Sequence, residues 1–207
     1  MMTDATLAVP ELATIEIHGV TRGSFILKGA LAAGAVYGAA AIGPFVGAAL
    51  AQTGGDIDIL NFALTLEYLE ADFYAKAQAL GLSADAMKLA KEFGDNEAAH
   101  VEALVATITK LGGTPAAKPT FTFPLSKPAD FGALAQTLED TGVSAYNGAA
   151  PGIESKEVLA AAGSIVQIEA RHAAAIRLFN NENPAPDAFD EVLGMQVVLD
   201  AVKPFIT

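Results

Sequence analysis

Two pairs of acidic and imidazole side chains recur in this sequence at the same short spacing. Glu97 lies three residues before His100, and Glu169 lies three residues before His172. In a helix, residues three apart lie on the same face, so each pair presents a carboxylate and an imidazole to the same neighbour. Both groups are ligands for divalent transition metals. The two E-x-x-H pairs are therefore candidate metal ligands.

The E-x-x-H pairs are the ends of a longer internal repeat. Glu67 and Tyr74 precede the first pair, and Glu139 and Tyr146 precede the second, each 72 positions after its partner. Such repetition marks two copies of one supersecondary unit. A lone E-x-x-H is most often a surface pair, but two copies in register with two further glutamates indicate one site built from both units.

The repeated glutamates and histidines fall on what the sequence predicts to be a buried stripe. Around the second pair, the spacing of Ile165, Glu169, His172 and Ile176 is four, three and four residues, which is the seam of a bundle helix. Buried and unpaired carboxylates would be strongly destabilising. Two divalent cations carry four positive charges and would neutralise the four glutamates.

One further glutamate competes for a place in this site. Glu70 follows Glu67 by one helical turn and could be the ligand from the same helix. The residue 72 positions after it is Gly142, whereas the residue 72 positions after Glu67 is another glutamate. The repeat therefore favours Glu67.

Four long helices must carry these residues. The apolar periodicity and the Gly- and Pro-rich breaks predict helices over residues 56–80, 84–111, 131–148 and 155–180, and a shorter C-terminal helix over 187–202. Ser83 and Asp130 are candidate N-caps. Residues 112–129 contain four prolines and predict a long connection. The fold class is therefore all-α, a four-helix bundle of two helical hairpins with a long crossover, plus a C-terminal helix.

With these elements in place, residues 56–181 resemble the ferritin-like di-iron carboxylate proteins, which use one glutamate from each of two helices and E-x-x-H from the other two. The stretch "LNFALTLEYLEADFY" and the N-terminal segment are most similar to the exported, desiccation-associated or rubrerythrin-like branch. The resemblance implies two Fe ions, with Mn as the alternative. The ligands it implies are Glu67 and Glu139 as terminal ligands, Glu97 and Glu169 as bridging ligands, and His100 and His172 on one metal each.

The two repeated tyrosines are candidates for support of the metal ligands. Tyr74 and Tyr146 lie seven residues after Glu67 and Glu139, on the same helix face. Their hydroxyls could donate hydrogen bonds to a ligand carboxylate of the opposite hairpin. The alternative is that either ring is only a packed core aromatic.

Composition narrows the possible partners and cofactors. The net charge of −12 makes nucleic acid and anionic lipid poor partners and cations good ones. The absence of cysteine excludes disulfides, thiolate zinc sites, iron–sulfur clusters and a rubredoxin-like electron-transfer centre. Any metal must be held by nitrogen and oxygen ligands.

The first 51 residues are typical of an export signal or membrane anchor. Arg22 and Lys28 precede an uncharged stretch over residues 29–51, which ends in a small-x-small pattern. The segment resembles a twin-arginine signal, although Gly23 stands at the position of the second arginine. We expect residues 52–207 to be the mature domain, located in the periplasm or cell envelope, with residues 29–51 able to anchor it if they are retained.

These observations predict a dinuclear metalloprotein that handles O2 or H2O2, with a ferroxidase or oxidative-stress role. A dimanganese catalase-like enzyme is the closest alternative. A stress-protective bundle, in which zinc or another metal serves only as a structural staple, is the non-enzymatic one. The fold is compatible with monomers and with homo-oligomers, so the sequence does not predict a cage.

Overall fold

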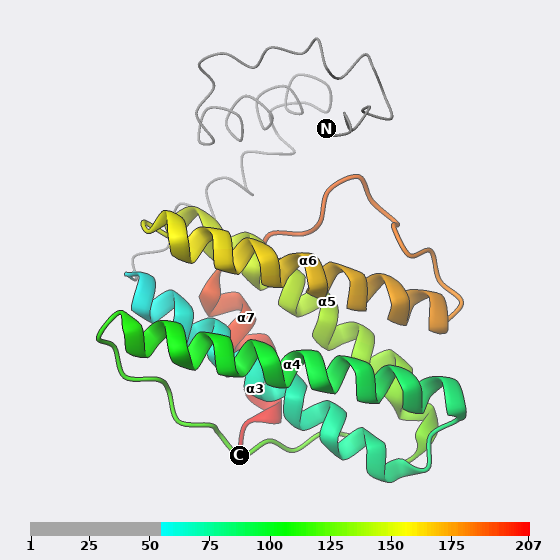
Figure 1. Ribbon diagram of the computed structural model, residues 1–207. Helices are drawn as coiled ribbons and strands as arrows, with labels where there is room; N and C mark the ends of the chain where they lie inside the picture. Colours follow the sequence, from blue (N-terminus) through cyan, green and yellow to red (C-terminus); the bar gives the residue numbers. More distant parts are fainter. Residues whose placement is uncertain (1–54) are drawn as a thin grey trace, which may run out of the picture. The chain divides into compact units, whose positions relative to one another are not determined.

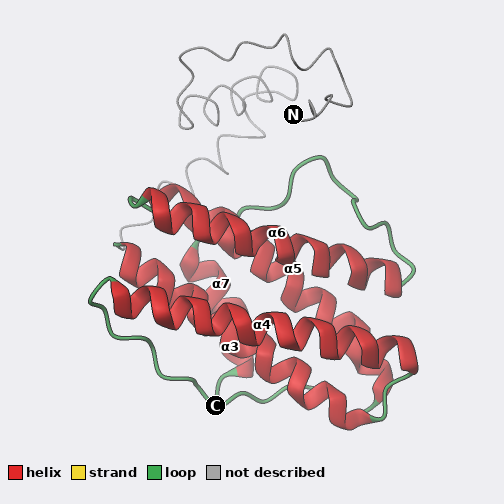
Figure 2. Ribbon diagram, in the orientation of Figure 1, coloured by secondary structure: helices red, strands yellow, loops and turns green. Residues whose placement is uncertain are grey.

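The computed structural model describes residues 55–207, and their regular secondary structure is helical (Figures 1 and 2). The predicted all-α fold class is confirmed. The helices are α3 (Asp56–Ala77), α4 (Ala84–Lys110), α5 (Phe131–Ala149), α6 (Lys156–Phe179) and α7 (Met195–Val202). Short 3₁₀ turns are η2 (Gln78–Leu80), η3 (Pro128–Asp130), η4 (Ala150–Gly152) and η5 (Lys203–Phe205). The predicted export or anchor segment lies outside the described residues.

The long helices pair into two hairpins. Helix α3 packs along α4, and α5 packs along α6, while residues 111–130 cross from one hairpin to the other (Figure 1). The hairpins meet through α3 and α5 and through α4 and α6. None of the described helices combines the length and the apolar character needed to cross a bilayer.

Serine side chains and left-handed glycines set several of the helix ends. Ser83 accepts a hydrogen bond from the amide of Ala86, and Ser155 accepts one from the amide of Val158. Gly81 has a φ of +65°, a left-handed conformation that suits glycine and lets the chain reverse between α3 and α4. The predicted Ser83 cap is confirmed.

Three details of the predicted helices are wrong. The first α-helix ends at Ala77 and continues to Leu80 only as a 3₁₀ turn. Asp130 does not cap α5, because its carboxylate accepts hydrogen bonds from Ser126 and Lys127 instead. The last helix begins at Met195 rather than at residue 187, because the amide of Leu193 donates to the carbonyl of Ser144 on α5 and is therefore not available for a helix.

The end of the described chain closes against the crossover. The amide of Thr122 donates to the carbonyl of Phe205, and the amide of Thr207 donates to the carbonyl of Thr120. The ring of Phe123 lies 5.7 Å from the ring of Phe205. These contacts hold the long connection against the bundle, where Phe121 joins one of the apolar clusters.

The apolar core consists of two clusters of buried side chains. One contains Phe73, Tyr74 and Phe131, and the other contains Leu64 and Tyr146. The repeated glutamates are also fully buried, although they belong to neither apolar cluster. The interior of the bundle therefore holds a charged group that needs its own explanation.

Candidate metal centre

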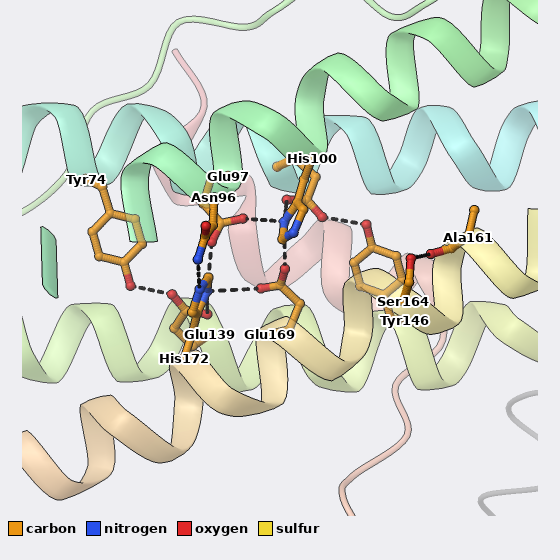
Figure 3. A network of polar contacts seen from close by, with 11 residues as sticks. Tyr74, Asn96, Glu97, His100, Glu139, Tyr146, Ala161, Ser164, Glu169 and His172 are labelled. Carbon is orange, nitrogen blue, oxygen red and sulfur yellow. Dashed lines mark hydrogen bonds and ion pairs between the residues drawn. The ribbon is translucent and has the colours of Figure 1, made fainter. Parts of the chain in front are cut away.

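Each of the four helices delivers glutamate to one buried point. The side chains of Glu67, Glu97, Glu139 and Glu169 have no solvent exposure. His172 is 3% exposed and His100 is 12% exposed at the side chain. Figure 3 shows the labelled members of this group converging between the helices, with Tyr74 and Tyr146 at opposite ends. The structure thus brings together all six residues that the sequence identified as candidate ligands.

The donor atoms form two overlapping groups. One group is Glu67, Glu97, His100 and Glu169; the other is Glu97, Glu139, Glu169 and His172. Within each group the donor atoms lie within 4.8 Å of one another. Glu97 and Glu169 belong to both groups. Because two carboxylates are shared, the two groups can hold two cations side by side.

In both groups the histidine turns Nδ1 toward the carboxylates. His100 Nδ1 lies 3.2 Å from Glu67 Oε2, 3.0 Å from Glu97 Oε2 and 3.0 Å from Glu169 Oε1. His172 Nδ1 lies 2.9 Å from Glu97 Oε1 and 3.4 Å from Glu139 Oε2. The two oxygens of Glu97 therefore face different histidines, which is the arrangement of a bridging carboxylate.

Several of these close atoms do not form hydrogen bonds. The buried nitrogen and oxygen atoms without a hydrogen-bond partner include His172 Nδ1, Glu97 Oε1, Glu139 Oε2 and both carboxylate oxygens of Glu169. Such atoms are rare in protein interiors, because each one has lost water without a replacement. All four residues belong to the second donor group, whose donor atoms lie within 4.8 Å of one another. Cations bound by these oxygens and nitrogens would satisfy them together.

In the absence of metal, the surrounding carboxylates favour the protonated forms of both histidines. Burial alone would lower the pKa of His100, but contacts with Glu169, Glu67 and Glu97 outweigh it and raise that pKa to about 12. The pKa of His172 is raised to about 10 by Glu139 and Glu97, again against the effect of burial.

The pKa values of the four carboxyl groups differ, although the repeat makes the glutamates equivalent in pairs. Burial raises the pKa of Glu97, but contacts with both histidines outweigh it and lower the pKa to about 2. For Glu169, burial is the larger effect and raises the pKa to about 8. Burial also raises the pKa of Glu67 and of Glu139. Excess negative charge at this point is therefore unfavourable unless positive charge accompanies it.

The tyrosines connect each hairpin to the other. The hydroxyl of Tyr74 on α3 donates a hydrogen bond to Glu139 on α5, and the hydroxyl of Tyr146 on α5 donates to Glu67 on α3 at 2.5 Å. Both rings are buried. The predicted hydrogen bonds to the opposite hairpin are thus present, and each fixes one carboxylate that belongs to a single donor group.

The sequence matches the ferritin-like domain family over residues 55–182, which is more than half of the chain. The chain belongs to this family. A crystal structure of a conserved hypothetical protein from Mycobacterium tuberculosis has the same fold, with a TM-score of 0.55, at 18% identity over 60% of this chain and 96% of that one. No curated protein matched the chain.

Two neighbours of His172 complete its surroundings in this ferritin-like domain. The ring of Phe93 stacks on the imidazole with the centroids 4.0 Å apart, and the side-chain amide of Asn96 lies 3.0 Å from Nε2. The atom of Asn96 that lies nearest to Nε2 is the amide nitrogen Nδ2, which can donate to Nε2 of a neutral imidazole that carries its proton on Nδ1. Sequence reasoning missed Asn96, whose only signal was its place in "DNEAAH" beside Glu97.

Glu70 is also buried, at 3% exposure, although its donor atoms belong to neither of the two groups. Burial and the charges of Glu169, Glu139 and Glu97 raise the pKa of its carboxyl well above the ordinary value. Of the two acidic residues weighed for α3, Glu67 is therefore the one that lies with the histidines. Glu70 is an additional buried acid whose role the repeat did not predict.

Proposed function

We propose that this domain binds two iron ions side by side and uses them to consume dioxygen or peroxide. The observation that carries the proposal is the sharing of Glu97 and Glu169 by two buried donor groups, each with its own histidine and its own terminal glutamate. Two separate cation sites would not need common carboxylates. Two ions a few ångströms apart do need them, because the shared negative charge offsets their mutual repulsion.

The donor set supports iron over softer metals. Each group offers three carboxylates and one imidazole, which suit Fe and Mn, and the chain contains no cysteine. Four carboxylates and two divalent ions are electrically neutral together, so the four glutamates of the two donor groups are balanced when both ions are bound. Manganese satisfies the same ligands, and it is therefore an outcome that the experiment below must separate from iron.

The protein side chains would position and insulate the ions. Tyr74 and Tyr146 hold the terminal carboxylates from the opposite hairpin, and Asn96 fixes the orientation of one imidazole. The complete burial of the four glutamates keeps bulk water from the carboxylates. Bound iron would supply the electrons that reduce dioxygen or peroxide.

The test is metal content together with oxidant consumption. The full chain is expressed, stripped of metal and titrated anaerobically with Fe²⁺, and air or H2O2 is then added. We expect two Fe per chain, oxygen or peroxide uptake in proportion, and an absorption band typical of oxo-bridged ferric ions. Bound Mn with rapid disproportionation of H2O2 would instead indicate a catalase-like enzyme. Stoichiometric Zn without redox activity would indicate a structural staple.

We propose separately that the chain is exported. Support comes from the sequence alone, from Arg22 and Lys28 before the uncharged stretch at residues 29–51. The test is the N-terminal sequence of protein recovered outside the cytoplasm. A mature N-terminus near Gln52 would fit cleavage, an intact membrane-bound chain would fit anchoring, and an intact cytoplasmic chain would contradict export.

A further inference from the structure

Glu70 and Gly142 meet where the two hairpins approach each other. A methyl group built on Gly142 would lie 3.0 Å from Glu70 Oε1 and 3.7 Å from Glu169 Oε2. Both carboxylate oxygens therefore lie around the same point, which the missing side chain of Gly142 leaves free. The carboxyl of Glu70 thus reaches across from α3 to α5 beside Glu169, one of the two shared glutamates.

The repeat explains why only one of these two positions carries an acid. Glu70 and Gly142 are equivalent by the 72-residue repeat. Any side chain at position 142 would begin in close contact with the carboxyl of Glu70, because 3.0 Å is tighter than ordinary packing. Two glutamates would therefore compete for one space. The glycine admits a single acid, and that acid comes from the first hairpin.

The additional acid changes the charge of the centre. Four glutamates carry four negative charges and are neutralised by two divalent ions, as described above. Burial favours the neutral form of the Glu70 carboxyl, whereas cations bound beside it favour the ionised form. With Glu70 ionised the buried carboxylates number five, so two divalent ions leave one negative charge unbalanced. One trivalent and one divalent ion carry five positive charges and balance it.

We infer that Glu70 selects the charge of the bound ions, favouring a pair that contains a trivalent ion over a pair of divalent ions. The inference rests on the proposed dinuclear site. Glu70 acts through its charge beside Glu169, in a space that Gly142 provides. For iron, the same preference favours the ferric ion.

The test uses ions that do not change oxidation state. Affinities for Zn²⁺ and for Ga³⁺, delivered as its nitrilotriacetate complex, are measured by competition on the full chain and on Glu70→Gln. Removing one negative charge beside the shared carboxylate of Glu169 weakens the binding of a trivalent ion more than that of a divalent one. We expect the ratio of Ga³⁺ to Zn²⁺ affinity to fall roughly ten- to a hundredfold in the variant.

A second substitution tests the same point without changing any charge. Gly142→Ala should displace the carboxyl of Glu70 and lower the Ga³⁺ to Zn²⁺ ratio in the same direction, and it should have no added effect when Glu70 is already glutamine. Glu102→Gln is the matched charge control, because Glu102 is exposed on α4. Gly163→Ala is the matched glycine control, because nothing lies within 4 Å of the methyl it adds.

The outcomes separate this inference from the proposed function. If the wild-type chain binds no pair of ions, both are wrong. If it binds two ions and both Glu70→Gln and Gly142→Ala keep the wild-type ratio, the dinuclear site stands and the role of Glu70 is overturned. If Glu70→Gln fails to fold by circular dichroism, an unchanged ratio in Gly142→Ala alone overturns the inference.

Discussion

The histidine of the α3–α4 hairpin is 12% exposed, whereas its counterpart in the α5–α6 hairpin is 3% exposed. The difference arises on α4, which places Phe93 and Asn96 against His172. The positions related to them by the repeat are occupied by Ile165 and Ile168, which offer neither an aromatic ring nor an amide. Each hairpin supplies one histidine, and the ring and the amide beside His172 come from the other hairpin.

A repeated set of candidate ligands need not produce two equivalent positions for a metal. The carboxylates and tyrosines obey the repeat, and the hydrogen bonds of Tyr74 and Tyr146 are related by it. The stacking ring, the amide and the additional acid Glu70 break it. All three belong to the first hairpin, so its sequence distinguishes the two ends of the centre.

The largest expected effect comes from removing the E-x-x-H pair of one hairpin. Glu97→Ala combined with His100→Ala should abolish binding of both ions, because the shared carboxylate is lost along with one imidazole. The mirror variant, Glu169→Ala with His172→Ala, should do the same. Metal content after dialysis is the measurement, with exposed Glu102→Ala as the control. Two ions retained in either double variant would show that the ligand assignment is wrong.

The next effect is that of pH on metal affinity. At neutral pH the metal-free centre holds protons on His100 and His172, because the pKa values of these groups are raised to about 12 and about 10. A cation occupies the same nitrogens, so binding releases the protons and the affinity rises with pH. We expect at least a tenfold gain in Zn²⁺ affinity per pH unit between about pH 6 and 7.

Calorimetry in buffers of different ionisation enthalpy counts the released protons and sharpens the comparison between hairpins. Because both histidines are expected to be protonated in the metal-free protein, His100→Ala and His172→Ala should each release fewer protons than wild type. A Zn²⁺ affinity that did not change with pH would contradict the proton-loaded state of the centre.

A smaller effect should follow from making the hairpins more alike. Asn96→Ile places in the first hairpin the residue that the repeat has at position 168. Because His172 Nε2 loses its partner, the affinity for one ion should fall about ten- to a hundredfold while the other ion is retained. Stepwise titration with Co²⁺, followed by its absorption, resolves the two ions. Equal loss at both positions would mean that Asn96 does not distinguish them.

The tyrosines should show the opposite result, equal effects in the two hairpins. Tyr74→Phe and Tyr146→Phe each remove one hydrogen bond to a buried terminal glutamate. Each should lower the free energy of unfolding by about 1 to 2 kcal/mol. Thermal and denaturant unfolding of the two variants is the measurement, with exposed Thr109→Val on α4 as a control. A loss confined to one variant would show that the hairpins differ here too.

The smallest effect concerns two helical glycines, one in each hairpin. A methyl group on Gly94 would lie 3.1 Å from Cβ of Tyr74, whereas a methyl group on Gly163 would have nothing within 4 Å. Gly163→Ala should therefore stabilise the domain by about 0.5 to 1 kcal/mol through helix propensity. Gly94→Ala should be destabilising, because α3 and α4 must move apart. Equilibrium unfolding measures both, and stabilisation by both would contradict the close approach.

Much of the centre could be predicted because its ligands obey two periodicities at once. The helical spacing placed Glu97 with His100 and Glu169 with His172 on one face, and the 72-residue repeat paired each residue with its counterpart. The donor groups contain the predicted six residues. A helix end with a local cap, such as Ser83, was also predictable, because the capping side chain and the amide that it accepts from lie within a few residues of each other.

The features that sequence reasoning missed depend on contacts between distant segments. The start of α7 is set by a hydrogen bond from Leu193 to Ser144, and Asp130 turns to Ser126 rather than to the helix it precedes. Neither contact can be recognised from the apolar periodicity of the sequence. Asn96 looked like an ordinary polar neighbour of Glu97 until α6 brought His172 to it.

The sequence by itself determined the long helices and the types and number of the candidate ligands, because these follow from local spacing and from the repeat. Only the tertiary structure decided which side chains surround each ligand. Packing of α4 against α6 enclosed His172 more than His100, and packing of α3 against α5 set Glu70 in the space beside Gly142. Spacing along a helix fixes the direction of a side chain, whereas its neighbours depend on how the helices pack.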